Sequence, residues 1–340
     1  MNSVVALGEM MLRLMPANNR RLEQADQFDA YYGGDESIVA TLLSRLGMDV
    51  RYLTKLPEGI LGDICERKLW EQHVDTRFIV RGPGRLGVNF YENGASVRPS
   101  MVVYDRANSV MSKAEFEDFD WDGALNGAKW FHVSGITPAL GPSCARMTRC
   151  ALEAARRAGV TTSVDLNYRR NLWTPEQAQQ VMIPLMEYVD VLIGNEEDAH
   201  LMLGVKSGHT DVIHGELDLK GYEESFRTLR QRYGFQIVAT TLRESRSASD
   251  NGWSCLVYDG EQFCHSRQYD IHLVDRGGGG AAFSGGLIYG LCTGKSLNEA
   301  CEFAAAASAL KQTILGDFDL ITLAEIERLA LGDTSGRVQR

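Results

Sequence analysis

Residues 275–286 read Asp-Arg-Gly-Gly-Gly-Gly-Ala-Ala-Phe-Ser-Gly-Gly, a glycine loop that opens a helix. The alternating run at 269–274 before it predicts a strand, and the apolar run at 282–291 after it predicts a buried helix. A strand, a glycine turn and a helix form an anion site, because bare N–H groups and the helix dipole both attract negative charge. Such a site can hold a phosphoryl group but cannot remove a proton, and position 281 is alanine.

Composition narrows the class of protein. The chain has 340 residues, of which 44% are hydrophobic and 24% charged, as expected for a soluble globular protein. The net charge of −10, without any block of Lys and Arg, argues against a nucleic-acid partner. No apolar run is long enough to span a membrane, and the beginning does not resemble a signal peptide. Seven scattered cysteines without a Cys-x-x-Cys pair fit a cytoplasmic protein.

Strand-like and helix-like segments alternate along most of the chain. The expected strands are 4–8, 50–53, 129–133, 162–166, 189–193 and 236–241. The expected helices are 38–46, 143–158 and 299–313. Strands separated by helices predict an α/β fold with a doubly wound, mostly parallel sheet that is flanked by helices.

Two regions break this alternation, because they contain strand-like runs without a helix between them. They cover about residues 11–33 and 87–106, and they predict a small β-sheet lid that protrudes from the core. We therefore expect a single domain over residues 1–330 with a C-terminal tail at 331–340. Half-exposed apolar strands of this kind also suit a dimer interface, so a homodimer through the lid sheet is expected.

Three interpretations compete for the glycine-rich segments. Gly277, Gly279 and Ala282 satisfy the dinucleotide pattern G-x-G-x-x-A, but they lie late in the chain and lack the following acidic ribose ligand. The run at 290–296 imitates a P-loop with one residue too few, and Gly294 there is better explained as a helix C-cap. The third interpretation, an anion hole at 278–280 for a phosphoryl group, agrees with the rest of the chain.

Several further segments carry a family resemblance. They are Gly33-Gly34-Asp35-Glu36, Arg98-Pro99-Ser100, 104–109, Ser134-Gly135-Ile136-Thr137, 165–169, 194–197 and 241–245. With the 275–286 loop, they make the chain similar to the ribokinase-type (PfkB-type) carbohydrate kinases, and within that family to the 2-keto-3-deoxygluconate kinases. The similarity covers roughly residues 3–330. It implies a doubly wound α/β core with a small β lid.

The resemblance also implies a reaction, phosphoryl transfer from ATP to a sugar hydroxyl, assisted by Mg²⁺ and often by a monovalent cation such as K⁺. Gly278, Gly279 and Gly280 would cradle the moving phosphoryl group. The residues implied for nucleotide, Mg²⁺ and the monovalent cation are Asn195, Glu197, Thr241, Arg243 and, near the cation, Asp275. Taken alone, Asn195 and Glu197 equally suit an ordinary helix N-cap with first-turn acids, and Thr241 and Arg243 a solvated turn at a strand end.

For the sugar acid, the natural carboxylate partners are Arg106 and Arg169, because a guanidinium binds a carboxylate through two parallel hydrogen bonds. The alternative for each arginine is a surface salt bridge. The other positions implied to line the sugar pocket are Gly34, Ile38, Asn89, Tyr104 and Asp165. We expect His132 and His272, which lie in apolar strand contexts, to be core or supporting residues.

The chain departs from the family pattern at its chemical centre. Ala281 stands where the family places its catalytic aspartate, and Ile38 where it places a sugar-binding asparagine. Gly277 replaces a β-branched residue and predicts a more flexible loop. The loss of a general base typically costs about 10²–10⁴ in rate. The chain is therefore expected to be an impaired or inactive sugar-acid kinase, with two alternatives: a pseudokinase that binds nucleotide or sugar acid as a regulatory or assembly partner, and a purely structural protein.

Overall fold

The middle of the central sheet is built from strands that are buried on both faces. In the computed structural model, which describes residues 3–206 and 218–336, it contains nine strands, eight of them in the order β14-β13-β12-β11-β10-β9-β1-β4, with β15 paired to β13. Their bounds are β1 Ser3–Leu7, β4 Asp49–Leu53, β9 Trp130–Ser134, β10 Thr161–Asp165, β11 Val191–Ile193, β12 Ile237–Ser245, β13 Asp250–Tyr258, β14 Phe263–His265 and β15 Tyr269–His272. Neighbours from β4 to β12 pair in parallel, and β13 pairs antiparallel with β12, β14 and β15.

Strand β1 shows why the sheet needs helices on both sides. Val4 and Ala6 belong to one buried hydrophobic cluster, and Val5 and Leu7 belong to the other. Successive side chains of a strand point to opposite faces, so a continuous apolar run buries both of them. The predicted doubly wound, mostly parallel α/β fold is therefore confirmed.

The helices divide between the two faces. The first cluster includes residues of α1 (Asp35–Arg45), α2 (Ile60–Trp70), α9 (Gly279–Cys292), α10 (Leu297–Lys311) and α11 (Leu323–Ala330). The second includes residues of α3 (Trp121–Leu125), α5 (Pro142–Arg157), α6 (Pro175–Leu185), α7 (Glu196–Leu203) and α8 (Leu219–Tyr233), with α4 (Ile136–Ala139) packed against it. Short 3₁₀ turns cover Ala17–Asn19, Leu22–Gln24, Met111–Lys113, Phe116–Asp118 and Met186–Tyr188.

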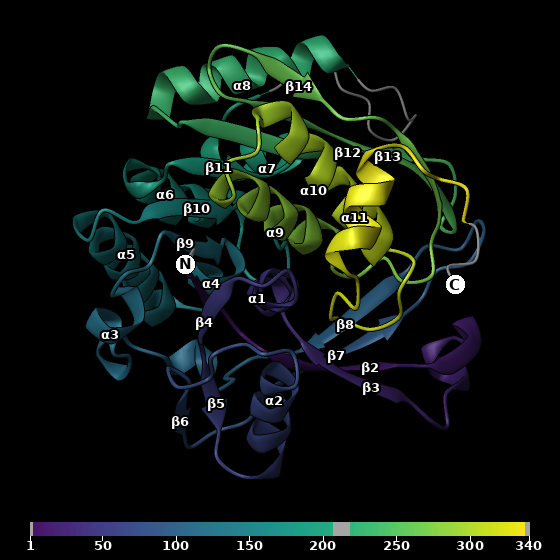
Figure 1. Cartoon of the computed structure of the whole chain (residues 1–340). Helices are drawn as coiled ribbons and strands as arrows, with labels where there is room; N and C mark the ends of the chain where they lie inside the picture. The colour runs from purple at the N-terminus through teal and green to yellow at the C-terminus, as the bar shows by residue number, and fades with distance from the viewer. Residues whose placement is uncertain (1–2, 207–217, 337–340) are drawn as a thin grey trace.

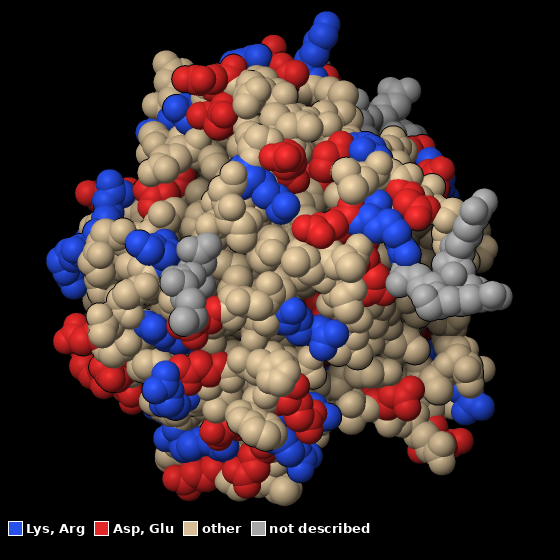
Figure 2. All heavy atoms as spheres, in the orientation of Figure 1, with Lys and Arg blue, Asp and Glu red and all other residues tan. Residues whose placement is uncertain are grey.

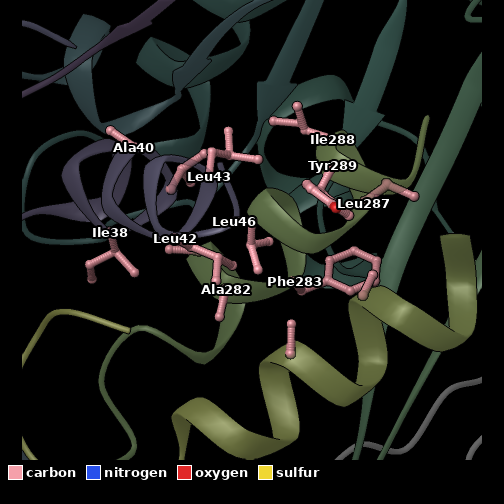
Figure 3. Packing of buried hydrophobic residues seen from close by; sticks show 14 of the residues in the cluster. Ile38, Ala40, Leu42, Leu43, Leu46, Ala282, Phe283, Leu287, Ile288 and Tyr289 are labelled. Atoms are coloured by element: carbon pink, nitrogen blue, oxygen red, sulfur yellow. The ribbon is translucent and has the colours of Figure 1, made fainter. Parts of the chain in front are cut away.

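Helix α9 lies between α1 and α10 (Figure 1). Its apolar side chains, among them Ala282, Phe283 and Leu287, belong to the same buried cluster as Leu42 of α1 and Leu46 at the end of that helix (Figure 3). Nearly every side chain of α9 is buried. The packing therefore fixes the position of the N-terminus of α9, where the glycine loop ends.

The lid is a separate sheet beside the core (Figure 1). Its strands are β2 (Met11–Met15), β3 (Asp29–Gly33), β7 (Gly87–Glu92) and β8 (Met101–Asp105), in the order β3-β2-β7-β8. This confirms the predicted small sheet. Two further short strands, β5 (Lys55–Pro57) and β6 (Val80–Gly82), pair in parallel as a separate two-stranded sheet.

Each strand and helix expected from the sequence has a counterpart within a few residues, but two local expectations are wrong. Thr241 and Arg243 do not end a strand, because β12 continues to Ser245 as one arm of an antiparallel hairpin with β13. Of the two histidines expected to be core or supporting residues, His132 is buried as expected, with a ring nitrogen 2.8 Å from the hydroxyl of Ser163. His272 is instead exposed, and its ring nitrogen lies 2.8 Å from the carboxylate of Asp250. The period-two pattern of β15 places His272 on its solvent side.

Residues 331–336 of the expected tail contain no helix or strand, and 337–340 lie outside the described residues. Throughout 3–206 and 218–336, no helix combines the length and the apolar character needed to cross a bilayer. Acidic and basic side chains are interspersed over the face of the molecule seen in Figure 2.

Candidate active site

A cavity of about 570 Å³ lies where the parallel strands end, between the core and the lid. Glu9, Asp165 and Asn195 line it from the segments that follow or end β1, β10 and β11, and Asn89 and Tyr104 line it from the lid. The strand order reverses between β1 and β9, and ligands of open α/β sheets bind at such a reversal. Its volume is in the range of small-molecule sites.

The glycine loop forms one wall of this cavity. Gly278 has φ +82°, a left-handed conformation that favours glycine, and it leads directly into α9. The first N–H of the helix with an internal partner is that of Ala282, which donates to the carbonyl of Gly278 at 2.8 Å. Within the described chain, the N–H groups of 278–281 donate no hydrogen bond, and all four residues line the cavity. Unpaired N–H groups at a helix N-terminus are suited to an anion.

No carboxylate stands at the helix mouth, because residue 281 is an alanine with 1% of its surface exposed. The acidic side chain in contact with α9 nearby is Asp165, which accepts a hydrogen bond from Ser284 at 3.3 Å. Asp35 also lines the cavity and accepts from Asn167 at 2.8 Å. The cavity thus contains acids, but α9 itself contributes no acidic side chain to it.

Asp275, six residues before Ala281, is held away from the cavity. Its carboxylate lies 2.5 Å from Arg13 and accepts from the N–H groups of Gly277 at 2.8 Å and Gly316 at 3.0 Å. The side chain is fully buried. These bonds use both carboxylate oxygens, so Asp275 orders the loop and is not available as a base. Its role beside a monovalent cation stays a prediction.

The two arginines expected at the sugar acid both line the cavity. Arg106 is not a surface residue: it is buried, pairs with Glu9 through Nε at 3.0 Å and through Nη2, and lies 5.6 Å from the ring centre of Tyr104. Arg169 donates to the carbonyl of Tyr168 at 3.1 Å. A guanidinium has five N–H donors, so each arginine keeps donors for a ligand.

Three further expected positions surround the same space. Gly34 precedes α1, and a Cβ there would lie 1.9 Å from the carbonyl oxygen of Glu9, so only glycine fits. Ile38 is 5% exposed, and its Cδ1 would lie 3.2 Å from a Cβ on Gly278. Asn89 lines the cavity from β7. The isoleucine therefore places an apolar surface against the glycine loop.

At the start of α7, the structure separates Asn195 from Glu197, which the sequence analysis had grouped. Asn195 caps α7, accepting from the N–H of Asp198 at 2.8 Å, and both residues line the cavity. Glu197 points to solvent with a side chain 66% exposed, 3.9 Å from Arg170. The sequence interpretation therefore missed Asp198, although the Asn-x-x-Asp spacing of a capping box was a signal for it.

Thr241 lines the cavity, whereas Arg243 is exposed and does not. Glu9, Arg13 and Asp317, which also line it, were missed as well.

Burial shifts the cavity acids toward their protonated forms. It raises the pKa of Glu36 to about 7, and the nearby charge of Asp35 adds to the rise. It raises the pKa of Asp198 to about 6 and that of Asp165 well above its ordinary value. Glu36 accepts from the N–H of Ser134 at 2.9 Å and from its hydroxyl at 2.7 Å, which partly oppose the rise in its pKa, and also from the hydroxyl of Thr137 at 2.9 Å.

Replacing Glu36 by glutamine should change how stability depends on pH. The folded wild type keeps the Glu36 proton up to about pH 7, whereas the unfolded chain releases it near the ordinary value of 4.5. The free energy of unfolding of the wild type should therefore fall, relative to Glu36→Gln, as pH rises from 4.5 to 7, by at most about 1.4 kcal/mol per pH unit. Urea unfolding of both proteins across this range measures the difference. A difference that does not change with pH would contradict it.

Comparison with known proteins places this geometry in a family. Residues 1–317 match the pfkB family of carbohydrate kinases. A 2-dehydro-3-deoxygalactonokinase from Haloferax volcanii is 32% identical over 98% of each chain. The crystal structure of a 2-dehydro-3-deoxygluconokinase from Thermotoga maritima is 49% identical, with a TM-score of 0.94 over 98% of this chain and 100% of that one. A fructokinase from Xylella fastidiosa with bound ATP, 21% identical with a TM-score of 0.75 over 97% of this chain and 98% of that one, shares the fold. The chain belongs to the pfkB family of carbohydrate kinases.

Proposed function

We propose that this chain binds ATP and 2-keto-3-deoxygluconate, or a similar sugar acid, as a kinase whose turnover is strongly reduced by Ala281. One observation carries the proposal: the unpaired N–H groups of 278–281 line the same cavity as Arg106 and Arg169. A phosphate and a carboxylate can therefore be held in one cavity. The similarity to a 2-dehydro-3-deoxygluconokinase along nearly the whole chain supports this choice of substrate.

In this proposal, Arg106 and Arg169 bind the carboxylate of the sugar acid through their remaining N–H donors. Burial of Arg106 beside Glu9 fixes its guanidinium, so little side-chain entropy is lost on binding. Tyr104, Asn89 and Gly34 bound the sugar from the lid side. Asp165 faces the same cavity beside α9, but burial raises its pKa, so it keeps its proton and is a poor substitute for a base.

The glycine loop would receive the transferred phosphoryl group, since its N–H groups need no rearrangement to bind three anionic oxygens. Asn195, Asp198 and Thr241 line the part of the cavity assigned to nucleotide. Mg²⁺ would neutralise phosphate charge and take most of its ligands from phosphate and water, with Asp198 as a carboxylate on the protein side. Glu197, which points away, is not part of this set.

A binding protein without turnover is the second candidate. An intact anion cradle beside an apolar residue 281 favours it, because binding needs the N–H groups while transfer also needs a base. In this case the cavity would bind nucleotide or sugar acid to regulate or assemble with a partner. The two candidates share the same ligands and differ only in turnover.

Calorimetry with ATP, ADP and 2-keto-3-deoxygluconate, followed by a coupled ATP assay, tests the proposal. We expect binding of nucleotide and sugar acid. Arg169→Met should lower the affinity for the sugar acid by about 10- to 100-fold, because a charged hydrogen bond is worth about 1.5–3 kcal/mol. It should leave the affinity for nucleotide unchanged. Arg170→Met, at the adjacent and 84% exposed arginine, is the matched control. Absence of heat with all three ligands would reject both candidates, and turnover above the ATP-only background would reject the second.

We also propose a cytoplasmic homodimer that pairs through the lid sheet. Val103 and Met101, 46% and 47% exposed, alternate along β8 with Val102 and Tyr104, which line the cavity. Phe28, 38% exposed, contacts Phe90 edge to face at 5.9 Å, so this side of the lid offers apolar surface for a second copy. Sedimentation of the purified chain as a monomer at micromolar concentration would contradict the dimer.

A further inference from the structure

Lys311 is a fully buried lysine at the end of α10, directly beneath the glycine loop. Its Nζ donates to the carbonyl oxygens of Gly316 at 2.8 Å and Gly277 at 3.0 Å, and to that of Ile314 at 3.5 Å. An ammonium group has three donors and no acceptor, so three carbonyls match it fully. The lysine thus joins the loop at 275–278 to the segment that follows α10.

The surroundings of Nζ are those of a cation site. Backbone carbonyl oxygens are the ligands with which proteins replace the hydration shell of K⁺, and ammonium is close to K⁺ in size. Burial raises the pKa values of Asp317 and Asp319, and the positive charge of Lys311 opposes that rise. Both carboxyl groups are therefore close enough to interact electrostatically with the ammonium group of Lys311. A monovalent cation bound beside Asp275, as the resemblance implies, would have to share carbonyls that already enclose a positive group.

The hydrogen bond from Lys311 to the carbonyl of Gly277 determines how the glycine loop faces the cavity. A trans peptide is planar, with its C=O and N–H pointing in opposite directions, and the described chain contains no cis peptide. Because the carbonyl of Gly277 points inward to Lys311, the N–H of Gly278 in the same peptide points outward. Ser308, one turn earlier on α10, holds the carbonyl of Gly279 at 2.6 Å and so directs the N–H of Gly280.

The N–H of Gly277 is bonded to Asp275, so this glycine is held on both sides. The loop is therefore fixed by hydrogen bonds at the position where a glycine alone predicts flexibility. Removing Lys311 would leave the carbonyls without a donor and free the peptide between Gly277 and Gly278 to rotate.

We propose that Lys311 is a positioning residue that takes the place of a bound monovalent cation and makes the anion cradle independent of K⁺. The melting temperature of the wild-type chain should therefore be the same in the chlorides of K⁺, Na⁺, ammonium and choline at equal ionic strength. Its affinity for ADP should also be the same in these salts. A rise in melting temperature or affinity specific to K⁺ would overturn the proposal and needs no variant.

Lys311→Ala gives the positive test. It should lower the melting temperature by several degrees, and K⁺ or ammonium, but not choline, should restore part of the loss by entering the vacated carbonyl site. Affinity for ADP should fall about 10- to 100-fold and recover with the same ions. Lys295→Ala is the control, because Lys295 lies beyond the far end of α9, over the ring of Phe303 at 5.4 Å. An equal response of Lys311→Ala to all four salts would contradict the proposal.

The ADP measurements rest on the proposed function, whereas the melting measurements do not. Wild-type protein that does not bind ADP would count against nucleotide binding, and the salt dependence of melting would still decide the role of Lys311. If Lys311→Ala does not fold in choline chloride, folding in KCl or ammonium chloride supports the proposal. Failure to fold in all salts leaves the decision to the wild-type comparison.

Discussion

Ala281→Asp should raise the rate of phosphoryl transfer to 2-keto-3-deoxygluconate by about 10²–10⁴ over the wild-type chain, the usual contribution of a general base. Residue 281 is in the first turn of α9 and lines the cavity, so an aspartate there would point its carboxylate at a bound sugar hydroxyl. The positive end of the helix dipole would stabilise the carboxylate. A coupled ATP assay at saturating substrate measures the change in kcat.

The matched control is Ala281→Asn, which adds the same volume without a proton acceptor and should leave turnover at the wild-type level. Ile38→Asn should improve binding of the sugar acid, so that it lowers the KM for the sugar acid more than it raises kcat. The double variant Ile38→Asn/Ala281→Asp should combine this effect with the gain in kcat. Equal gains from asparagine and aspartate at 281 would show that a base is not what the cavity lacks. Unchanged turnover in the double variant, with both ligands bound, would favour a pseudokinase.

The fold was predictable because its signals are local. Each core strand is a short apolar run and each long helix has an apolar face, so the sheet at 4–8, 50–53 and 129–133 could be identified before its partners were known. The lid could be identified from strand-like runs that lack an intervening helix. The end of β12 could not, because β12 continues past its parallel partner only by pairing with β13, and such pairing has no local pattern.

The site was harder to predict, since its contacts join residues far apart in the sequence. Arg106 meets Glu9 across 97 positions, and Arg13 meets Asp275 across 262. An arginine in the sequence gives no sign of the acid that it will face. The choice between Glu197 and Asp198 depends on helix geometry, because neighbouring residues of a helix point about 100° apart and only one faces the cavity.

Arg13 connects the lid to the glycine loop through charge. It extends from β2 and pairs with Asp275 at 2.5 Å and with Asp317 at 3.2 Å. Its guanidinium carbon also lies 5.1 Å from the ring centre of Tyr31 and 5.1 Å from that of Tyr91. Asp275 in turn holds the N–H of Gly277. One buried arginine therefore pairs with two acids at once and orders the loop from the lid side.

Arg13→Met should lower the free energy of unfolding by about 3–5 kcal/mol, because it leaves Asp275 buried without its cation and removes one of the two cations near Asp317. Arg77→Met is the control: Arg77 also pairs with an aspartate, at 2.7 Å, but its side chain is 79% exposed, so its loss should cost no more than about 1 kcal/mol. Urea unfolding at pH 7 measures both. A cost equal to that of Arg77→Met would mean that solvent or another cation already compensates the acids, and that the lid and the loop are not coupled through Arg13.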